Sequence, residues 1–269
     1  MKSFREFLNE RNFYVSESKS GGKIIPKNTN ELKRLVADES VHLGDIDVRN
    51  ITSFNFLFKS SNRKDYSGLK TWDVSHVKDM SAMFFMNYNF KGFEIENWDV
   101  SNVKDMGGMF FACKWFNADL SKWNVSNVTN MSMMFDEAIN FTGNGIENWD
   151  VSNVKNMESM FAKTEKFNSD ISRWNVSNVT NMANMFSEAK SFNQPIGKWD
   201  VSKVESMYSM FEYTKKFNQP LDNWNLKNLK SMRFIFFKAE SFNQKLSSWE
   251  KKIPLSVWGR SDVDIKKFF

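Results

Sequence analysis

The sequence contains few of the residues on which disulfides, metal centres and membrane anchors depend. Among its 269 residues there are one cysteine, two histidines and four prolines. One cysteine cannot form a disulfide within the chain, and His42 and His76 lack the close spacing of zinc ligands. No apolar stretch approaches the roughly 18 residues that a membrane-spanning helix needs. We therefore expect no metal site and no membrane span.

Motifs typical of enzymes are missing as well. The sequence has no glycine-rich phosphate loop and no Gly-x-Ser-x-Gly motif. Cys113 falls at a repeat position otherwise occupied by small residues, so we expect it to be a small buried side chain rather than a nucleophile. We predict a protein that is not an enzyme, with no catalytic residues and no cofactor.

Charge is balanced and spread along the chain. The net charge is +5, and the first ten residues carry charges where a secretory signal would need an apolar core. We expect a cytoplasmic or virion location. The scattered lysines are typical of a soluble surface, although they also allow weak binding of nucleic acid.

What the sequence does contain is a repeat. Tryptophans recur at intervals of 25 or 26 residues, at Trp72, Trp98, Trp123, Trp149, Trp174, Trp199, Trp224 and Trp249. Thirteen of the 16 methionines and most phenylalanines also fall at fixed distances after these tryptophans. Such a period indicates one small unit stacked many times, whose conserved apolar positions form a shared core.

Two apolar spacings occur within each repeat. The Trp-x-Val step has the period of two that marks a short strand, whereas Val128, Met131, Met134 and Phe135 follow steps of three and four, as in a helical turn. A serine between the two segments is placed to cap that turn. The pattern predicts an α/β repeat with a parallel β-sheet on one face and short helical turns on the other.

The repeat resembles that of a known family. Leu120, Trp123, Val125 and Val128 follow the pattern of a leucine-rich-repeat core, with Trp and Val in place of leucines. Segments 123–135 and 174–186 are similar, nearly letter for letter, to the BspA-like leucine-rich repeats of bacterial and mycoplasma surface proteins. The resemblance implies a leucine-rich-repeat-like solenoid used for adhesion or recognition.

The ends differ from the repeats. We expect a leader and linker at 1–28, a cap helix within 29–45, a degenerate first repeat at 46–71, seven repeats at 72–249 and a C-terminal cap at 250–269. In the cap helix, Asn30 is the expected capping residue, and Leu32, Leu35 and Val36 have helical spacing. The caps would cover the open ends of the stack.

The first ten residues carry a second resemblance. They are similar to the capsid-targeting leaders of T-even-like phages, which are cut after a Leu/Ile-x-Glu sequence; here Leu8, Asn9 and Glu10 fit that site, with cleavage after Glu10. A plain amphipathic N-terminal turn explains the same residues. The resemblance implies a phage head or virion-associated protein as an alternative function.

Polar residues flank each tryptophan and form two rows. On a sheet they would line a solvent-exposed face, which we predict binds a protein or glycan partner of unknown identity, with the protein a monomer. Alternation of Asp and Asn also keeps like charges apart, so solubility explains the rows equally well. The predicted binding residues are Asp99, Lys122, Asn124, Asp150, Arg173, Asn175, Lys198 and Asp200.

A Phe-Asn pair ends most repeats, and we expect its phenylalanine inside and its asparagine bonded to a neighbouring backbone. Replacing Phe192 by Ala should then lower the free energy of unfolding by about 3 to 5 kcal/mol. Thermal or urea denaturation measures this loss. An unchanged midpoint would place this column of residues on the surface.

Overall fold

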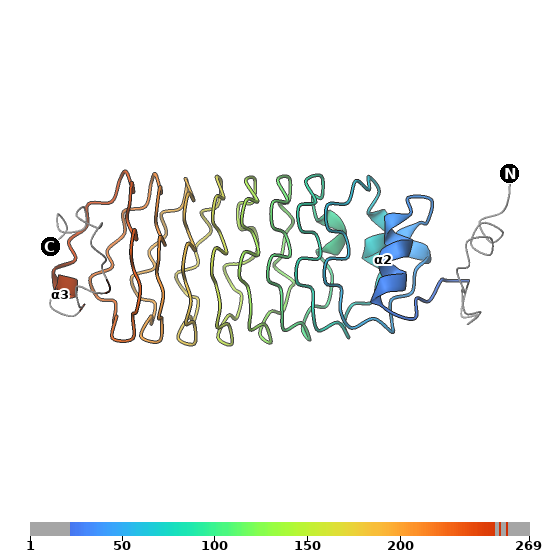
Figure 1. Ribbon diagram of the computed structural model, residues 1–269, viewed down its shortest axis with the longest axis horizontal. Helices are drawn as coiled ribbons and strands as arrows, with labels where there is room; N and C mark the ends of the chain where they lie inside the picture. The colour runs from blue at the N-terminus through green and yellow to red at the C-terminus, as the bar shows by residue number, and fades with distance from the viewer. Residues whose placement is uncertain (1–21, 251–252, 254–256, 258–269) are drawn as a thin grey trace.

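The protein is a stack of similar coils arranged along one long axis (Figure 1). The computed structural model describes residues 22–250, 253 and 257. Its helices lie at the ends of the stack: α2 spans Thr29–Ala37 and α3 spans Ser247–Glu250. Three short 3-10 helices, Leu43–Asp45 (η1), Ser67–Thr71 (η2) and Phe93–Ile95 (η3), lie toward the N-terminal end.

The predicted parallel sheet and helical turns are wrong. In the described part of the chain, neighbouring coils pair only through isolated parallel bridges, one residue per coil, as at Asn130, Asn156 and Asn181. The Trp-x-Val step belongs to no strand, and no helix forms in the coils from Trp98 to Trp224. The structure is therefore not the predicted leucine-rich-repeat solenoid with a strand-lined face; most of each coil is turn and irregular backbone.

Tight turns explain why both predictions failed. Around Trp123, one turn closes with the bond from the Trp123 N–H to the Leu120 carbonyl, and the next with the bond from the Val128 N–H to the Val125 carbonyl. Only a short segment remains between them, too short to pair as a strand. Successive four-residue turns also bring every third or fourth side chain inward, which is the spacing that the sequence pattern attributed to a helix.

Two residues of each coil adopt a left-handed backbone conformation. They lie ten and fourteen residues after the tryptophan, or after Ile46 in the first coil, as at Met133 (φ 54°) and Glu137 (φ 60°). Each is the third residue of a turn, where a positive φ is required in type II geometry. A positive φ ends any right-handed helix, and all but one of these positions hold a residue other than glycine.

Between these turns, alternate backbone N–H groups bond to the next coil. In the coil of Trp123, the N–H groups of Met131, Met133 and Phe135 donate to the carbonyls of Asn156, Glu158 and Met160, at 2.9, 2.7 and 3.0 Å. Where a residue between them donates its backbone N–H, the acceptor lies in the same coil. The backbone therefore satisfies its hydrogen bonds between coils without forming an extended sheet.

The tryptophans tie each coil to the preceding one. Every repeat tryptophan is at most 5% exposed, and its indole Nε1 donates to a carbonyl of the previous coil at 2.8–3.2 Å. The Leu120 carbonyl, for example, accepts the Trp123 backbone N–H and the Trp149 indole N–H. One carbonyl thus closes a turn and holds the next coil.

Phenylalanines form two stacked columns in the core, beside buried columns of valine and methionine. Phe186 and Phe192 stack within their coil at 3.9 Å between centroids, and Phe186 stacks on Phe211 of the next coil at 5.7 Å. Phe192 is fully buried, as predicted. Cys113 is also buried, and burial raises the pKa of its thiol far above the ordinary value. The column positions read from the sequence are therefore confirmed as interior.

Helix α2 lies at the N-terminal end of the stack and buries Leu32, Leu35 and Val36. The predicted cap residue is wrong, because the helix begins earlier: the Asn28 side chain accepts the Glu31 N–H, and Asn30 lies inside the helix. At the other end Ile253 and Val257 are buried. Most of the predicted leader and C-terminal cap lies outside the described residues.

The left-handed turn positions can be tested by substitution at Ser159, which has φ 54°. Because a β-branched residue is strained there, Ser159→Val should lower stability by about 1–2 kcal/mol, whereas Ser159→Gly should leave it unchanged or raise it. At Lys155, which has an ordinary negative φ, Lys155→Val should be more stable than Lys155→Gly. Urea denaturation measures the stability of both pairs of variants. If Ser159→Val were more stable than Ser159→Gly, as within a helix, the turn geometry would be contradicted.

Candidate functional site

The eight predicted binding residues all lie exposed beside the buried tryptophans. Asp99, Asn124, Asp150, Asn175 and Asp200 directly follow a tryptophan, and Lys122, Arg173 and Lys198 directly precede one. Stacking brings them into two rows along the coils, so the structure places them near one another. The surface that carries them is a succession of turns, not the predicted strand-lined face.

A local structural role explains the Asp and Asn residues. The side-chain oxygen of Asp150 accepts the backbone N–H of Ser152 at 3.0 Å, and Asn175 does the same with Ser177 at 3.2 Å. Hydrogen bonding to Ser152 and Ser202 lowers the pKa values of Asp150 and Asp200. Asp and Asn are both suited to this turn. Their alternation therefore follows from backbone geometry and does not by itself indicate a ligand.

A further row, distinct from the two rows beside the tryptophans, consists of the asparagines that follow the inner phenylalanines. The Asn168 side-chain oxygen accepts the Asn193 N–H at 2.8 Å, and Asn193 and Asn218 continue the row at 2.9 and 3.1 Å. This confirms the predicted bond from the asparagine to a neighbouring backbone. The amides therefore hold this edge of the stack together.

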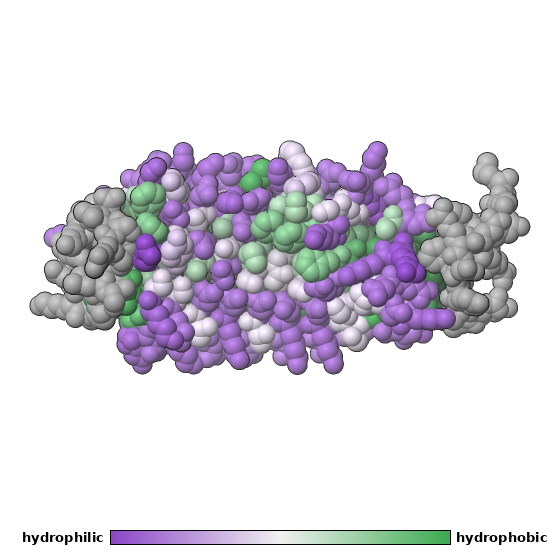
Figure 2. Space-filling view, in the orientation of Figure 1, coloured by the Kyte–Doolittle hydropathy of each residue, from purple (hydrophilic) through white to green (hydrophobic). Residues whose placement is uncertain are grey.

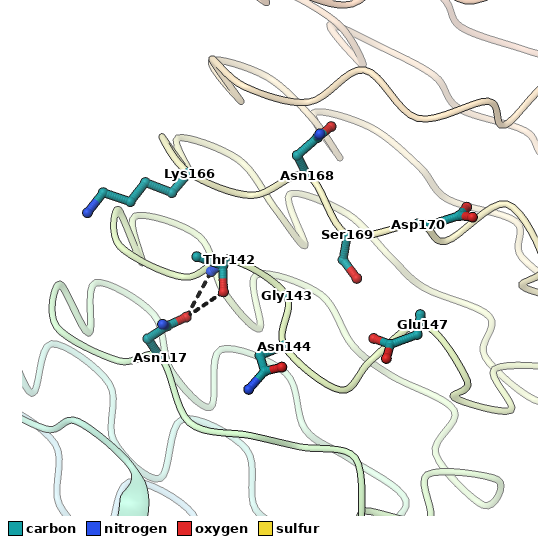
Figure 3. Close-up of a pocket in the computed structure, with 9 residues that line it drawn as sticks. All are labelled: Asn117, Thr142, Gly143, Asn144, Glu147, Lys166, Asn168, Ser169 and Asp170. Atoms are coloured by element: carbon teal, nitrogen blue, oxygen red, sulfur yellow. Dashed lines mark hydrogen bonds between the residues drawn. The ribbon is translucent and has the colours of Figure 1, made fainter.

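The asparagine row is interrupted where a longer coil intervenes, and an open polar depression of about 580 Å³ lies there (Figure 3). The 26-residue coil of Trp123 has Thr142 in place of the asparagine; Thr142 donates twice to Asn117, through its N–H at 2.9 Å and its hydroxyl at 2.8 Å. Amides, hydroxyls, carboxylates and one lysine line the depression: Asn117, Thr142, Gly143, Asn144, Glu147, Lys166, Asn168, Ser169 and Asp170.

The extra residue of that coil requires glycine next to the depression. Gly143 has φ 90°, and a Cβ atom there would lie 2.6 Å from the Cβ of Ser169. Lys166 extends away from the other lining residues in Figure 3. The depression can offer hydrogen bonds to a polar molecule, but none of its lining residues is aromatic or aliphatic.

A different surface exposes aromatic side chains. Apolar surface gathers over the N-terminal half of the stack in Figure 2. We define the aromatic face as segments 55–63, 81–89 and 107–115, which are equivalent parts of three successive coils. Its exposed rings are Phe56 (40% exposed), Tyr88 (43%) and Trp115 (59%). Contiguous exposed apolar surface of this kind often marks an interaction site.

The rings of the aromatic face contact one another and two lysines. Phe85 stacks on Phe111 at 4.4 Å between centroids. The Lys59 ammonium lies 5.0 Å from the Phe56 centroid and 5.7 Å from that of Phe85. Lys114 lies over Tyr88 at 5.2 Å. The surface therefore combines apolar rings with cations held close to them.

Beyond the aromatic face, the equivalent positions carry charges of both signs. Glu137 forms an ion pair with Lys163 at 2.8 Å, and Glu165 pairs with Lys190. These pairs line a small charged cleft of about 250 Å³. The side of the stack is thus aromatic in its first coils and salt-bridged in its middle coils.

Asp136 lies at the boundary between these two regions. Its side chain is 8% exposed, and its Oδ1 has no hydrogen-bond partner in the described part of the structure. Burial raises the pKa of Asp136 to about 7; the positive charge of Lys163 opposes that rise, and the negative charges of Glu137 and Glu188 add to it. The group is therefore a buried acid that titrates near neutral pH.

Sequence reasoning missed both the aromatic face and Asp136. The signal for the face was present, because Phe85 and Phe111 fall at a repeat position where the next four coils have Asp, Ala, Ser and Glu, and only the coil of Trp224 has Phe again. Within the described residues there is no group of three or more His, Cys, Asp or Glu side chains that could hold a metal ion. No described helix is long and apolar enough to cross a bilayer.

The coils, their indole bonds and their phenylalanine columns define a repeat protein of stacked turns. The family model for mycoplasma proteins of unknown function, DUF285, matches residues 52–145 and 137–249, and the chain belongs to this family. The two matched ranges meet within the coil of Trp123. No curated protein and no solved structure matches the chain.

The pKa of Asp136 predicts a pH-dependent stability. An Asp with an ordinary pKa of 3.8 when unfolded and about 7 when folded stabilises the fold below pH 3.8, and that stability is lost as pH rises toward 7. Asp136→Asn removes the charge. The free energy of unfolding of this variant, relative to that of the wild type, should therefore increase by about 2–4 kcal/mol between pH 4 and pH 8. Urea denaturation at several pH values measures it, with Asp99→Asn, an exposed position, as control. Parallel curves for wild type and Asp136→Asn would contradict the assignment.

Proposed function

We propose that this protein is a non-catalytic recognition module that binds a macromolecular partner, in the manner of a BspA-like repeat protein, through the aromatic face. The observation that supports it is the exposure of Phe56, Tyr88 and Trp115 together on neighbouring coils. The fold does not require these rings, because the core is already filled by the buried columns. The near-identity of segments 123–135 and 174–186 to BspA-like repeats supports an adhesion or recognition role.

The rigid stack favours binding through a broad side. Each coil is bonded to its neighbours by backbone groups, an indole and, in several coils, an asparagine, so exposed side chains keep fixed relative positions. A partner then meets a preformed surface and loses little binding energy to ordering it. The Asp and Asn row offers less, because one oxygen of each of its turn residues is already bonded to backbone.

The two alternatives from the sequence stay predictions. The leader resemblance rests on residues 1–10, which lie outside both the described residues and the ranges matched by the family model. Nucleic-acid binding rests on the dispersed positive charge.

The binding surface can be tested with two sets of substitutions in the full chain. The wild type, immobilised, should capture a partner from a cell extract that mass spectrometry identifies, and Phe56→Asn with Tyr88→Ser and Trp115→Ser should lose it. Asp150→Lys with Arg173→Glu and Asp200→Lys, on the predicted row, should retain it. Removing exposed aromatic anchors typically weakens binding by about 2 kcal/mol or more each.

Circular dichroism spectra and thermal midpoints check that both variants are folded. If only the variant with Asp150→Lys, Arg173→Glu and Asp200→Lys lost the partner, the binding surface would be the Asp and Asn row instead of the aromatic face. Capture unaffected by either set, or no specific partner at all, would reject the proposed function.

A further inference from the structure

The aromatic face lacks negative charge, unlike the equivalent segments of the later coils. Its three segments contain no Asp or Glu, but they contain the exposed Lys59 and Lys114. Each equivalent segment of the later coils, at 132–140, 158–166, 183–191, 208–216 and 233–241, has at least one carboxylate. Lys59 is therefore a cation in a part of the stack without carboxylates of its own, whereas Lys114 also lines the charged cleft with Glu137 and Glu165.

Carboxylates close to the aromatic face are already engaged. Asp79 accepts hydrogen bonds from the Ser53 hydroxyl at 2.8 Å and from the Ser81 N–H at 2.9 Å. Asp105 accepts the Gly107 N–H at 2.8 Å and the Asn130 side chain at 2.9 Å. Both Asp79 and Asp105 are half-buried in the row of bridges between coils. Lys59 and Lys114 thus form no ion pair among the described residues.

Ring geometry distinguishes between classes of anionic partner. Phe111 stacks on Phe85 at 4.4 Å between centroids, and the ammonium of Lys59 lies 5.7 Å from the Phe85 centroid, so part of the ring surface of Phe85 is occupied. Tyr88 likewise has Lys114 over its ring. Nucleobases bind proteins by stacking on free ring faces. Phe85 is half-buried and leaves only part of its ring exposed, which suits the side chains of an apolar protein segment.

Small residues lie beneath the rings of this face. Ala82 and Gly108 occupy the tenth position of two successive coils, between the exposed side chains of Phe56 and Met133. The backbone of Gly108 lies against Phe85, whose Cδ2 would be 3.5 Å from a Cβ atom added there. Ala82 and Gly108 are themselves buried, so a partner would meet the surrounding rings here rather than the backbone.

From these observations we infer that the aromatic face binds an acidic, apolar segment of a partner protein, with Leu or Phe side chains against Phe56 and Phe85 and carboxylates at Lys59 and Lys114. This inference rests on the proposed function and specifies the chemistry of its partner. Ammonium groups held over aromatic rings remain available to a carboxylate at their outer side. Charge attraction steers the segment, and ring contacts hold it.

The C-terminal part of the chain contains a matched control. Tyr213 resembles Phe56 closely: its φ is 54°, it is 41% exposed, and Lys238 lies 5.1 Å from its ring centroid. Tyr213, however, directly follows Glu212 in the sequence, so this ring and lysine lie in a segment that carries its own negative charge. The two pairs differ in the charge around them and in their place in the coil, since Phe56 lies ten residues after Ile46 and Tyr213 fourteen residues after Trp199.

The experiment uses the full chain and fluorescence anisotropy of labelled probes. A peptide in which Leu and Phe alternate with Glu should bind, and its counterpart with Lys in place of Glu should not. Phe56→Asn with Lys59→Glu should weaken binding about tenfold or more. Tyr213→Asn with Lys238→Glu, the matched control, should bind like the wild type. Asn is chosen because it tolerates the positive φ.

Two further probes separate the other anionic partners, namely a single-stranded oligonucleotide and vesicles of phosphatidylserine with phosphatidylcholine. Tighter binding of either probe than of the acidic peptide, lost in the Phe56 and Lys59 variant, would overturn this inference while the proposed function stands. Equal binding of acidic and basic peptides, equal loss in both variants, or no binding of any probe would also overturn it. The proposed function fails if the full chain captures no specific partner, or if capture is unaffected by loss of the exposed rings.

Discussion

The structure depends on one hydrogen bond that recurs between every pair of neighbouring coils. A carbonyl three residues before each tryptophan closes the turn of its own coil and accepts the indole N–H of the next. Because the indole is buried, an unsatisfied N–H would be unfavourable, so each coil is held in one register relative to the last. The phenylalanine columns and the alternating backbone bonds follow from that register.

This arrangement separates the fold from the surface. Inward positions repeat almost without change, whereas the ninth to seventeenth positions of each coil vary from aromatic to salt-bridged along the stack. The repeated core therefore supports different surfaces on the same backbone. Asp136 marks the boundary between two such surfaces, where a carboxylate occupies a site that Phe85 and Phe111 fill in the preceding coils and accordingly titrates near neutral pH.

The distribution of surface chemistry favours recognition through the first coils. The Asp and Asn residues beside the tryptophans are explained by turns that any such coil needs, and the charged middle coils pair their own charges. The aromatic face combines exposed rings on neighbouring coils with lysines in segments that contain no carboxylate. Membership of the DUF285 family agrees with the repeat and leaves the partner to be identified by experiment.

The sequence by itself determined the repeat length, the buried columns and the asparagine bonds, because a strict period requires that equivalent residues share one environment. Trp174, Phe192 and Asn193 could be placed in this way without coordinates. The path of the backbone could not, since steps of three and four residues arise from successive turns as well as from a helix, and only the positive φ at Met133 and Glu137 distinguishes them. The tertiary structure also decided which varied positions meet on one side, since Phe56, Phe85 and Phe111 are separated in sequence by whole coils and become neighbours only when the coils stack.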